Sequence, residues 1–113
     1  MIHQMNLCEN PFAAIRDGSK TVEMRLNDEK RRKISIGDYI EFIRIQTKEK
    51  LLCEVTGLCV FRDFHELYSH YEKQSIGYSD EEKADPNDML IYYSQEAIER
   101  YGVLAIEIQK IKA

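Results

Sequence analysis

Five short segments of this 113-residue chain have strand-like patterns, and they limit its possible folds more than any other feature. They are "MIHQMNLC" (1–8), "KTVEMRL" (20–26), "ISIGDYIEFIRIQ" (34–46), "LLCEVTGLCVF" (51–61) and "VLAIEIQKI" (103–111). Side chains of a strand alternate between two faces, and the segment 20–26 alternates without a break. Gly57, inside the fourth segment, indicates a kink or a close backbone approach.

Three helical stretches lie between these strands. They are "FAAIRD" (12–17), entered through Asn10 and Pro11, "RDFHELYSHYEK" (62–73) with Asp63 as N-cap, and "DPNDMLIYYSQEAIERYG" (85–102). Ser94 either breaks the last helix or caps a new one. Because the helices do not alternate regularly with the strands, we expect one α+β domain over residues 1–113, built on a small closed or nearly closed sheet.

The charge balance limits what the chain can bind. Charged residues make up 32% of the sequence and the formal net charge is −4, which argues against bulk electrostatic coating of nucleic acid. The charge is uneven, however, because residues 29–33, "EKRRK", are basic and residues 80–88, "DEEKADPND", are acidic. We call residues 29–33 the basic loop, and such a local patch remains compatible with a small RNA site.

Several other classes of protein are not indicated. No window of 18 uninterrupted apolar residues is present, so no membrane partner is expected. The first residues lack the pattern of a secretory signal, which makes the cytoplasm the expected location. The three cysteines and three histidines do not have the spacing of a metal site. We therefore expect no metal and no cofactor.

The segment "DGSKTVEMRL" (17–26) carries the main chemical signal. Strand alternation places Glu23 and Arg25 on one face, and a turn brings Lys20 in from the side. The planar guanidinium suits phosphate or carbonyl oxygens, and a carboxylate beside two cations stays ionised. A desolvated lysine beside Arg25 is also a candidate base or nucleophile. The alternative is an ion-pair ladder on a solvent-facing strand, which contributes little to stability.

A family resemblance follows from this segment and its surroundings. The pattern G-x-K-x-x-E-x-R begins at Gly18, and a second group of pattern residues follows it at Gly37, Asp38, Ile40 and Phe42. The segment "YSQEAIERYGVLAIEI" (93–108) is the third element of the pattern. Over nearly its whole length the sequence resembles the ASCH domain family of the PUA-like superfamily. The resemblance implies a small β-barrel of about five strands with flanking helices. It also implies a cleft lined by the lysine, glutamate and arginine of the motif.

The same resemblance implies a range of activities. The family is thought to act on RNA or related ligands, one branch hydrolyses acetylated cytidine, and nuclease members are described. That hydrolase branch uses a lysine, a threonine three positions later and a distant glutamate. Here Lys20 matches, but Glu23 occupies the threonine position and Thr21 lies next to the lysine. Glu72 or Glu66 is the downstream candidate.

The leading hypothesis is therefore an RNA- or nucleotide-binding domain with a charged cleft. Its expected ligand-binding residues are Lys20, Thr21, Glu23, Arg25, Arg31 and Arg32. The last two belong to the basic loop and are expected to contact phosphates. The partner would be RNA or a nucleoside-like small molecule.

Three alternatives remain open. The first alternative is a hydrolase of a modified cytidine, with Lys20 and Glu23 as catalytic residues and Thr21 and Glu72 in support. The second is a nuclease, and the third is a non-catalytic protein-interaction module that uses its tyrosines. These tyrosines, which could also stack on bases, are Tyr68, Tyr71, Tyr78, Tyr92 and Tyr93.

Overall fold

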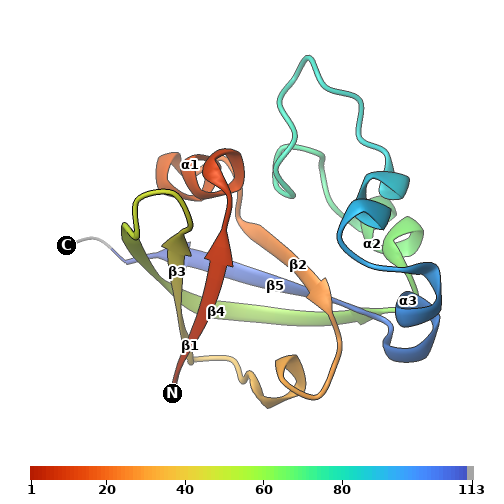
Figure 1. The fold of residues 1–113 in the computed structure, drawn as a ribbon, viewed down its shortest axis with the longest axis horizontal. Helices are drawn as coiled ribbons and strands as arrows, with labels where there is room; N and C mark the ends of the chain where they lie inside the picture. The colour runs from red at the N-terminus through yellow and green to blue at the C-terminus, as the bar shows by residue number, and fades with distance from the viewer. Residues whose placement is uncertain (112–113) are drawn as a thin grey trace.

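The computed structural model describes residues 1–111 (Figure 1). Its strands are β1 (Ile2–Leu7), β2 (Val22–Leu26), β3 (Tyr39–Arg44), β4 (Lys50–Phe61) and β5 (Val103–Lys110). Its α-helices are α1 (Glu9–Asp17), α2 (Phe64–His70) and α3 (Gln95–Tyr101), and its 3₁₀ helices are η1 (Arg31–Lys33) and η2 (Pro86–Ile91). Within residues 1–111, no helix is both long and apolar enough to cross a membrane.

The five strands form one curled sheet in the order β1-β3-β4-β5-β2. β1 pairs with β3 in parallel, and the other neighbours are antiparallel. The sheet curls so that both edge strands, β1 and β2, lie in front of β4 and β5 in Figure 1. The predicted small α+β barrel is thus confirmed, as a half-barrel that is open between its two edge strands.

β5 separates two hydrophobic cores. Leu104, Ile106 and Ile108 pack with α1, β1, β3 and β4 in the first core. Val103 and Ala105 pack in the second core, which α2, η2 and α3 cover. The near-continuous apolar run of this strand follows from its burial on both faces.

β2 carries its charges on the face of the first core. Glu23 lies opposite Ile106 and Arg25 opposite Leu104 in the antiparallel register with β5. The alternate residues of β2 pack in the second core. The predicted alternation therefore holds, but the charged face points into the half-barrel and not into solvent.

Gly57 marks a bulge in β4. The register with β5 shifts between Val55 and Gly57. A Cβ atom on Gly57 would lie 2.7 Å from Oε1 of Glu107, so a larger residue here would force the Glu107 side chain to move. The structure thus has a bulge and a close approach to Glu107 at the position where the sequence indicates a kink or a close backbone approach.

The helix predicted over residues 85–102 is wrong as one element. η2 is entered at Asp85, whose side chain accepts a hydrogen bond from the Asn87 amide, and it ends at Ile91. A new helix, α3, begins after Ser94, whose hydroxyl accepts from the amide of Ala97 at 3.1 Å. Serine at an N-cap satisfies an amide that has no partner inside the helix, so the recapping alternative is the correct one.

Candidate functional site

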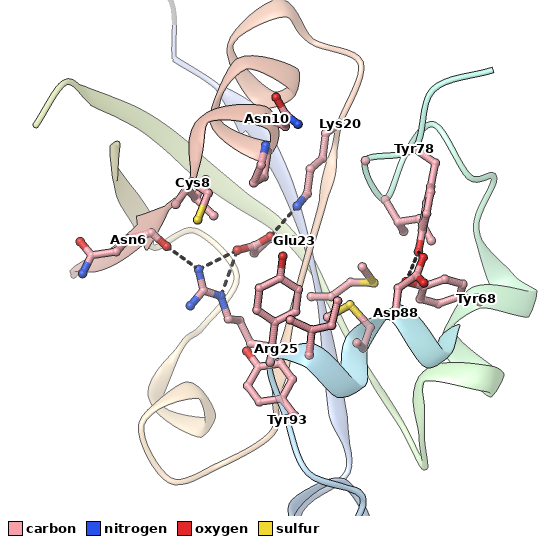
Figure 2. A pocket seen from close by; sticks show the side chains of 18 of the residues that line it. Asn6, Cys8, Asn10, Lys20, Glu23, Arg25, Tyr68, Tyr78, Asp88 and Tyr93 are labelled. Carbon is pink, nitrogen blue, oxygen red and sulfur yellow. Dashed lines mark hydrogen bonds and ion pairs between the residues drawn. The ribbon is translucent and has the colours of Figure 1, made fainter. Parts of the chain in front are cut away.

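A cavity of about 530 Å³ lies along the open side of the half-barrel (Figure 2). One wall comes from the end of β1, the start of α1 and the charged residues of β2. The other comes from α2, the segment 76–82, and η2 with the two tyrosines that follow it. This volume falls within the range of small-molecule pockets.

Lys20, Glu23 and Arg25 converge in the first wall, and we call them the charged triad. Nζ of Lys20 donates to Oε1 of Glu23 at 2.8 Å, and Nε of Arg25 donates to Oε2 at 2.9 Å. Lys20 is only 7% exposed and Glu23 only 3%. The solvent-facing ladder is therefore excluded by geometry, because Lys20 and Glu23 are buried and the partly buried Arg25 completes one hydrogen-bonded network with them.

Arg25 also joins the two edge strands. Its Nη2 atom donates to the carbonyl oxygen of Asn6 in β1 at 3.1 Å, while the same nitrogen lies 2.8 Å from Glu23 (Figure 2). Backbone pairing does not join β1 to β2 in the sheet order of residues 1–111. The guanidinium thus bridges the opening at which the cavity lies.

Local chain geometry brings Lys20 to this position. Gly18 ends α1 in the left-handed conformation, and the Lys20 amide then donates to the carbonyl oxygen of Ala14 at 3.0 Å. Gly77 lies over the lysine, with φ of +112°, and a Cβ atom there would be 3.3 Å from Cδ of Lys20. The carbonyl oxygen of Ser75 accepts from the two amides that follow Lys20, which fixes the segment over β2.

The triad keeps hydrogen-bonding capacity for a ligand. Burial alone raises the pKa of Glu23, but Lys20 and Arg25 outweigh burial and lower this pKa below its ordinary value. Within residues 1–111 Lys20 makes one side-chain hydrogen bond, and Nη1 of Arg25 makes none. An ammonium has three donors, so two remain, and the triad has one excess positive charge. It can receive a group rich in acceptor oxygens.

Aromatic side chains line the second wall. Four of the five tyrosines named from the sequence contribute to the cavity, and they are Tyr68, Tyr78, Tyr92 and Tyr93. Tyr93 stacks on Phe64 with ring centroids 6.0 Å apart and planes 13° from parallel. Tyr71 lies outside the lining and donates to Glu107. Four of the tyrosines that the sequence singles out therefore line the cavity.

Thr21 and the downstream glutamates do not join the triad. Thr21 is exposed, because β2 begins only at Val22, and it is not part of the cavity lining. Glu72 is also exposed and outside the lining. Glu66 accepts a hydrogen bond from the Arg62 amide at the start of α2. The structure therefore does not assemble the lysine, hydroxyl and glutamate set of the hydrolase branch.

The basic loop also lies outside the cavity lining. Nη1 of Arg31 donates to Asp28 at 3.1 Å, and Nε of Arg32 donates to the carbonyl oxygen of Asn27 at 2.8 Å. Any contact of this loop with phosphates concerns a ligand that extends beyond the cavity.

The sequence does not reveal several contributors to the site, among them Asn6, Gly77 and Asp88. Asn6 contributes a backbone oxygen, which no sequence pattern indicates. Gly77 has a positive φ, and a glycine in a polar loop was the available signal. Asp88 lies in the acidic stretch of the sequence, and only the fold shows that it lines the cavity. Within residues 1–111, no group of three or more potential ligands could hold a metal ion.

Comparison with known proteins places the fold in a family. The family model described as "ASCH domain" matches residues 5–112. The crystal structure of hypothetical protein PH0355 is 31% identical, covers 98% of this chain and 100% of its own, and superposes with a TM-score of 0.83. The solution structure of protein PF0455 from Pyrococcus furiosus is 30% identical over 100% of both chains, with a TM-score of 0.78.

A more distant structure has the same fold. A mutant of ZmASCH from Zymomonas mobilis is 16% identical and matches 98% of this chain and 73% of its own, with a TM-score of 0.69. The search of curated proteins found no match. On the family match over residues 5–112, the chain belongs to the ASCH domain family.

Proposed function

We propose that the protein binds RNA or a nucleotide-like ligand in the cavity along the open side of the half-barrel. The observation that carries this proposal is the charged triad, in which Lys20 and Glu23 are buried and donors remain unused, at a cavity of about 530 Å³. Burying charge is costly, so a buried charged network is a candidate functional site.

The chemistry of the two walls supports this choice of ligand. Lys20 and Arg25 present donors to phosphate or carbonyl oxygens, and Glu23 fixes both cations in place. The N-terminus of α1, with Cys8 as its N-cap, lies at the same wall, and helix N-termini favour acceptor groups. Tyr92 and Tyr93 offer aromatic faces to a base.

The geometry favours this proposal over a protein-interaction module. The three charged side chains converge in a concavity, whereas a docking face would present them on an open sheet. It also favours binding over hydrolysis. Glu23 has a lowered pKa and is paired with both cations, so at neutral pH it is an anion that orients the lysine and not a proton donor.

The test of binding compares variants of the two basic regions. Affinity for a short single-stranded RNA and for cytidine monophosphate is measured across a salt series. We expect Arg25→Ala to weaken both about tenfold, the cost of losing a hydrogen bond to a charged group. Arg32→Ala, the matched control, should leave the affinity for the mononucleotide unchanged. Equal affinities of the wild type and Arg25→Ala would refute the site.

Hydrolysis and nuclease action have their own assays. The purified protein is incubated with acetylated cytidine, and the release of cytidine is followed with Lys20→Ala as the control. Turnover that depends on Lys20 would show that this cavity is catalytic. RNA cleavage that Lys20→Ala abolishes would favour the nuclease alternative, and we expect neither activity from the geometry of the triad.

A further inference from the structure

A second polar cluster lies in the cavity, in the wall opposite the charged triad. It consists of Tyr68, Tyr78 and Asp88, which come from α2, the loop after it and η2 (Figure 2). The two tyrosine hydroxyl oxygens are 2.9 Å apart, and Oη of Tyr78 lies 2.7 Å from Oδ2 of Asp88. The proposed function above makes no use of this cluster.

The hydrogen bonds of the cluster have one direction. The hydroxyl of Tyr78 has a single proton, and the short contact to a carboxylate is the stronger of its bonds. Tyr68 therefore donates to Tyr78, which donates to Asp88. Burial and the hydrogen bond that Tyr78 donates to Asp88 raise the pKa of Tyr78 above its ordinary value, so its hydroxyl remains protonated. This relay holds the Asp88 carboxylate in place, with lone pairs left for another donor.

Glu82 adds a second negative charge to this wall. The amide of Ser79 donates to Oε1 of Glu82, and this hydrogen bond lowers the pKa of the carboxyl group below its ordinary value. One wall thus carries the excess positive charge of the triad, and the other carries carboxylates. A ligand that satisfies both needs acceptor oxygens at one end and an N–H donor at the other.

Two independent features support a ligand that bridges the walls. Asp88 is an oriented acceptor, and Lys20, more than nine-tenths buried at the same cavity, has donors that no residue in 1–111 uses. We propose that Asp88 is a specificity determinant, which accepts a hydrogen bond from an amino group of a nucleoside-sized ligand held by Lys20 and Arg25. This inference rests on the proposed function and narrows its ligand to amino-bearing nucleosides.

Physical chemistry gives the sign and size of the preference. The Asp88 carboxylate attracts an amino group and repels a carbonyl oxygen at the same position. The site therefore favours a base with the amino group and rejects a base with the carbonyl oxygen. Discrimination between bases by such side-chain contacts reaches about tenfold or more. The amino-bearing member of each otherwise similar nucleoside pair should therefore bind more tightly.

The experiment titrates the full chain with cytidine against uridine, and adenosine against inosine. For the wild type we expect the amino-bearing member of each pair to bind about tenfold more tightly. Asp88→Asn should bring this ratio close to one, because an amide can both donate and accept. Tyr78→Phe should reduce the ratio partly, since Asp88 loses its donor. The matched control, Glu81→Gln, removes one charge from the same acidic stretch outside the cavity lining and should leave the ratio unchanged.

Two results would overturn the inference. One is a wild type without preference, and the other is an unchanged ratio in Asp88→Asn. If Arg25→Ala still loses affinity for all four nucleosides in that case, the proposed function stands and only the role of Asp88 fails. If neither the nucleosides nor RNA bind the wild type, the proposed function fails, and the inference fails with it.

Discussion

Two ion pairs in this protein have the same spacing but different surroundings. Lys20 and Glu23 are three residues apart and 2.8 Å from nitrogen to oxygen, and their side chains are 7% and 4% exposed. Asp28 and Arg31 are also three residues apart, at 3.1 Å, but are 28% and 19% exposed. The first pair lies at the cavity, and the second lies outside its lining.

The difference shows that burial, and not the presence of charge, separates a candidate site from a surface feature. Both pairs contain residues that the sequence marks as candidate ligand contacts, namely Lys20 and Glu23 in the first and Arg31 in the second. The pair of Asp28 and Arg31 is only partly buried, so water screens its attraction more strongly and the pair contributes less to stability. A buried pair keeps a fixed geometry, and each partner becomes costly if the other is removed.

The largest effect is expected from a substitution that removes one partner of the buried pair. Glu23→Ala leaves Lys20 and Arg25 without their carboxylate, and we expect the free energy of unfolding to fall by about 3–5 kcal/mol. Arg31→Ala removes one partner of the more exposed pair and should cost about 1 kcal/mol or less. Urea denaturation of both variants measures the difference. Equal losses would mean that the triad is no more than a surface pair.

A smaller effect is expected where the chain covers Lys20. Gly77→Ala places a Cβ atom 3.3 Å from the lysine at φ of +112°, and should destabilise the protein by about 1–3 kcal/mol. Gly37→Ala is the matched control, because its φ is +95° but nothing lies within 4 Å. Only Gly77→Ala should also weaken ligand binding, since it displaces Lys20. Matching affinities of the two variants in a nucleotide titration would argue against this contact.

The smallest effect concerns pH. The pKa of Glu23 is lowered from 4.5 in the folded protein, so the unfolded chain binds the proton more readily. The stability that Glu23 contributes is therefore present above about pH 4.5 and is lost as the pH falls. The stability difference between the wild type and Glu23→Gln should narrow on acidification, as followed by urea midpoints.

Asp38 does not affect the pH dependence of the stability difference between the wild type and Glu23→Gln. Hydrogen bonds from His3 and from the Ser35 amide lower its pKa from 3.8 to about 2, so it also loses a stabilising contribution in acid. This loss is common to the wild type and to Glu23→Gln and cancels in their difference. A difference that stays constant between pH 6 and pH 3 would contradict the role given to Glu23.

The sequence predicts the sheet better than the cavity. All five strands lie where their patterns place them, because alternation and apolar runs reflect burial on one or two faces. The alternation of β2 also brings Glu23 and Arg25 together correctly. The parallel pairing of β1 with β3, by contrast, depends on contacts between distant segments that no local pattern encodes.

Gly77 and Asp88 in the second wall escaped prediction for the same reason. Between residues 71 and 94 the chain has no α-helix or strand, so periodicity gives no signal. Gly77 and Asp88 reach the cavity through tertiary contacts with Lys20 and Tyr78. The helix expected over 85–102 failed because the caps at Asp85 and Ser94 start two separate elements.

Mapping the ligand on isotope-labelled protein tests the central claim most directly. Cytidine monophosphate is titrated into the protein, and the backbone amide signals are followed by NMR. The account predicts that the largest changes occur in residues 20–25, 76–78 and 88–93, with residues 29–33 unchanged. Changes confined to residues 29–33, with the cavity residues unaffected, would place the ligand on the basic loop and contradict the account.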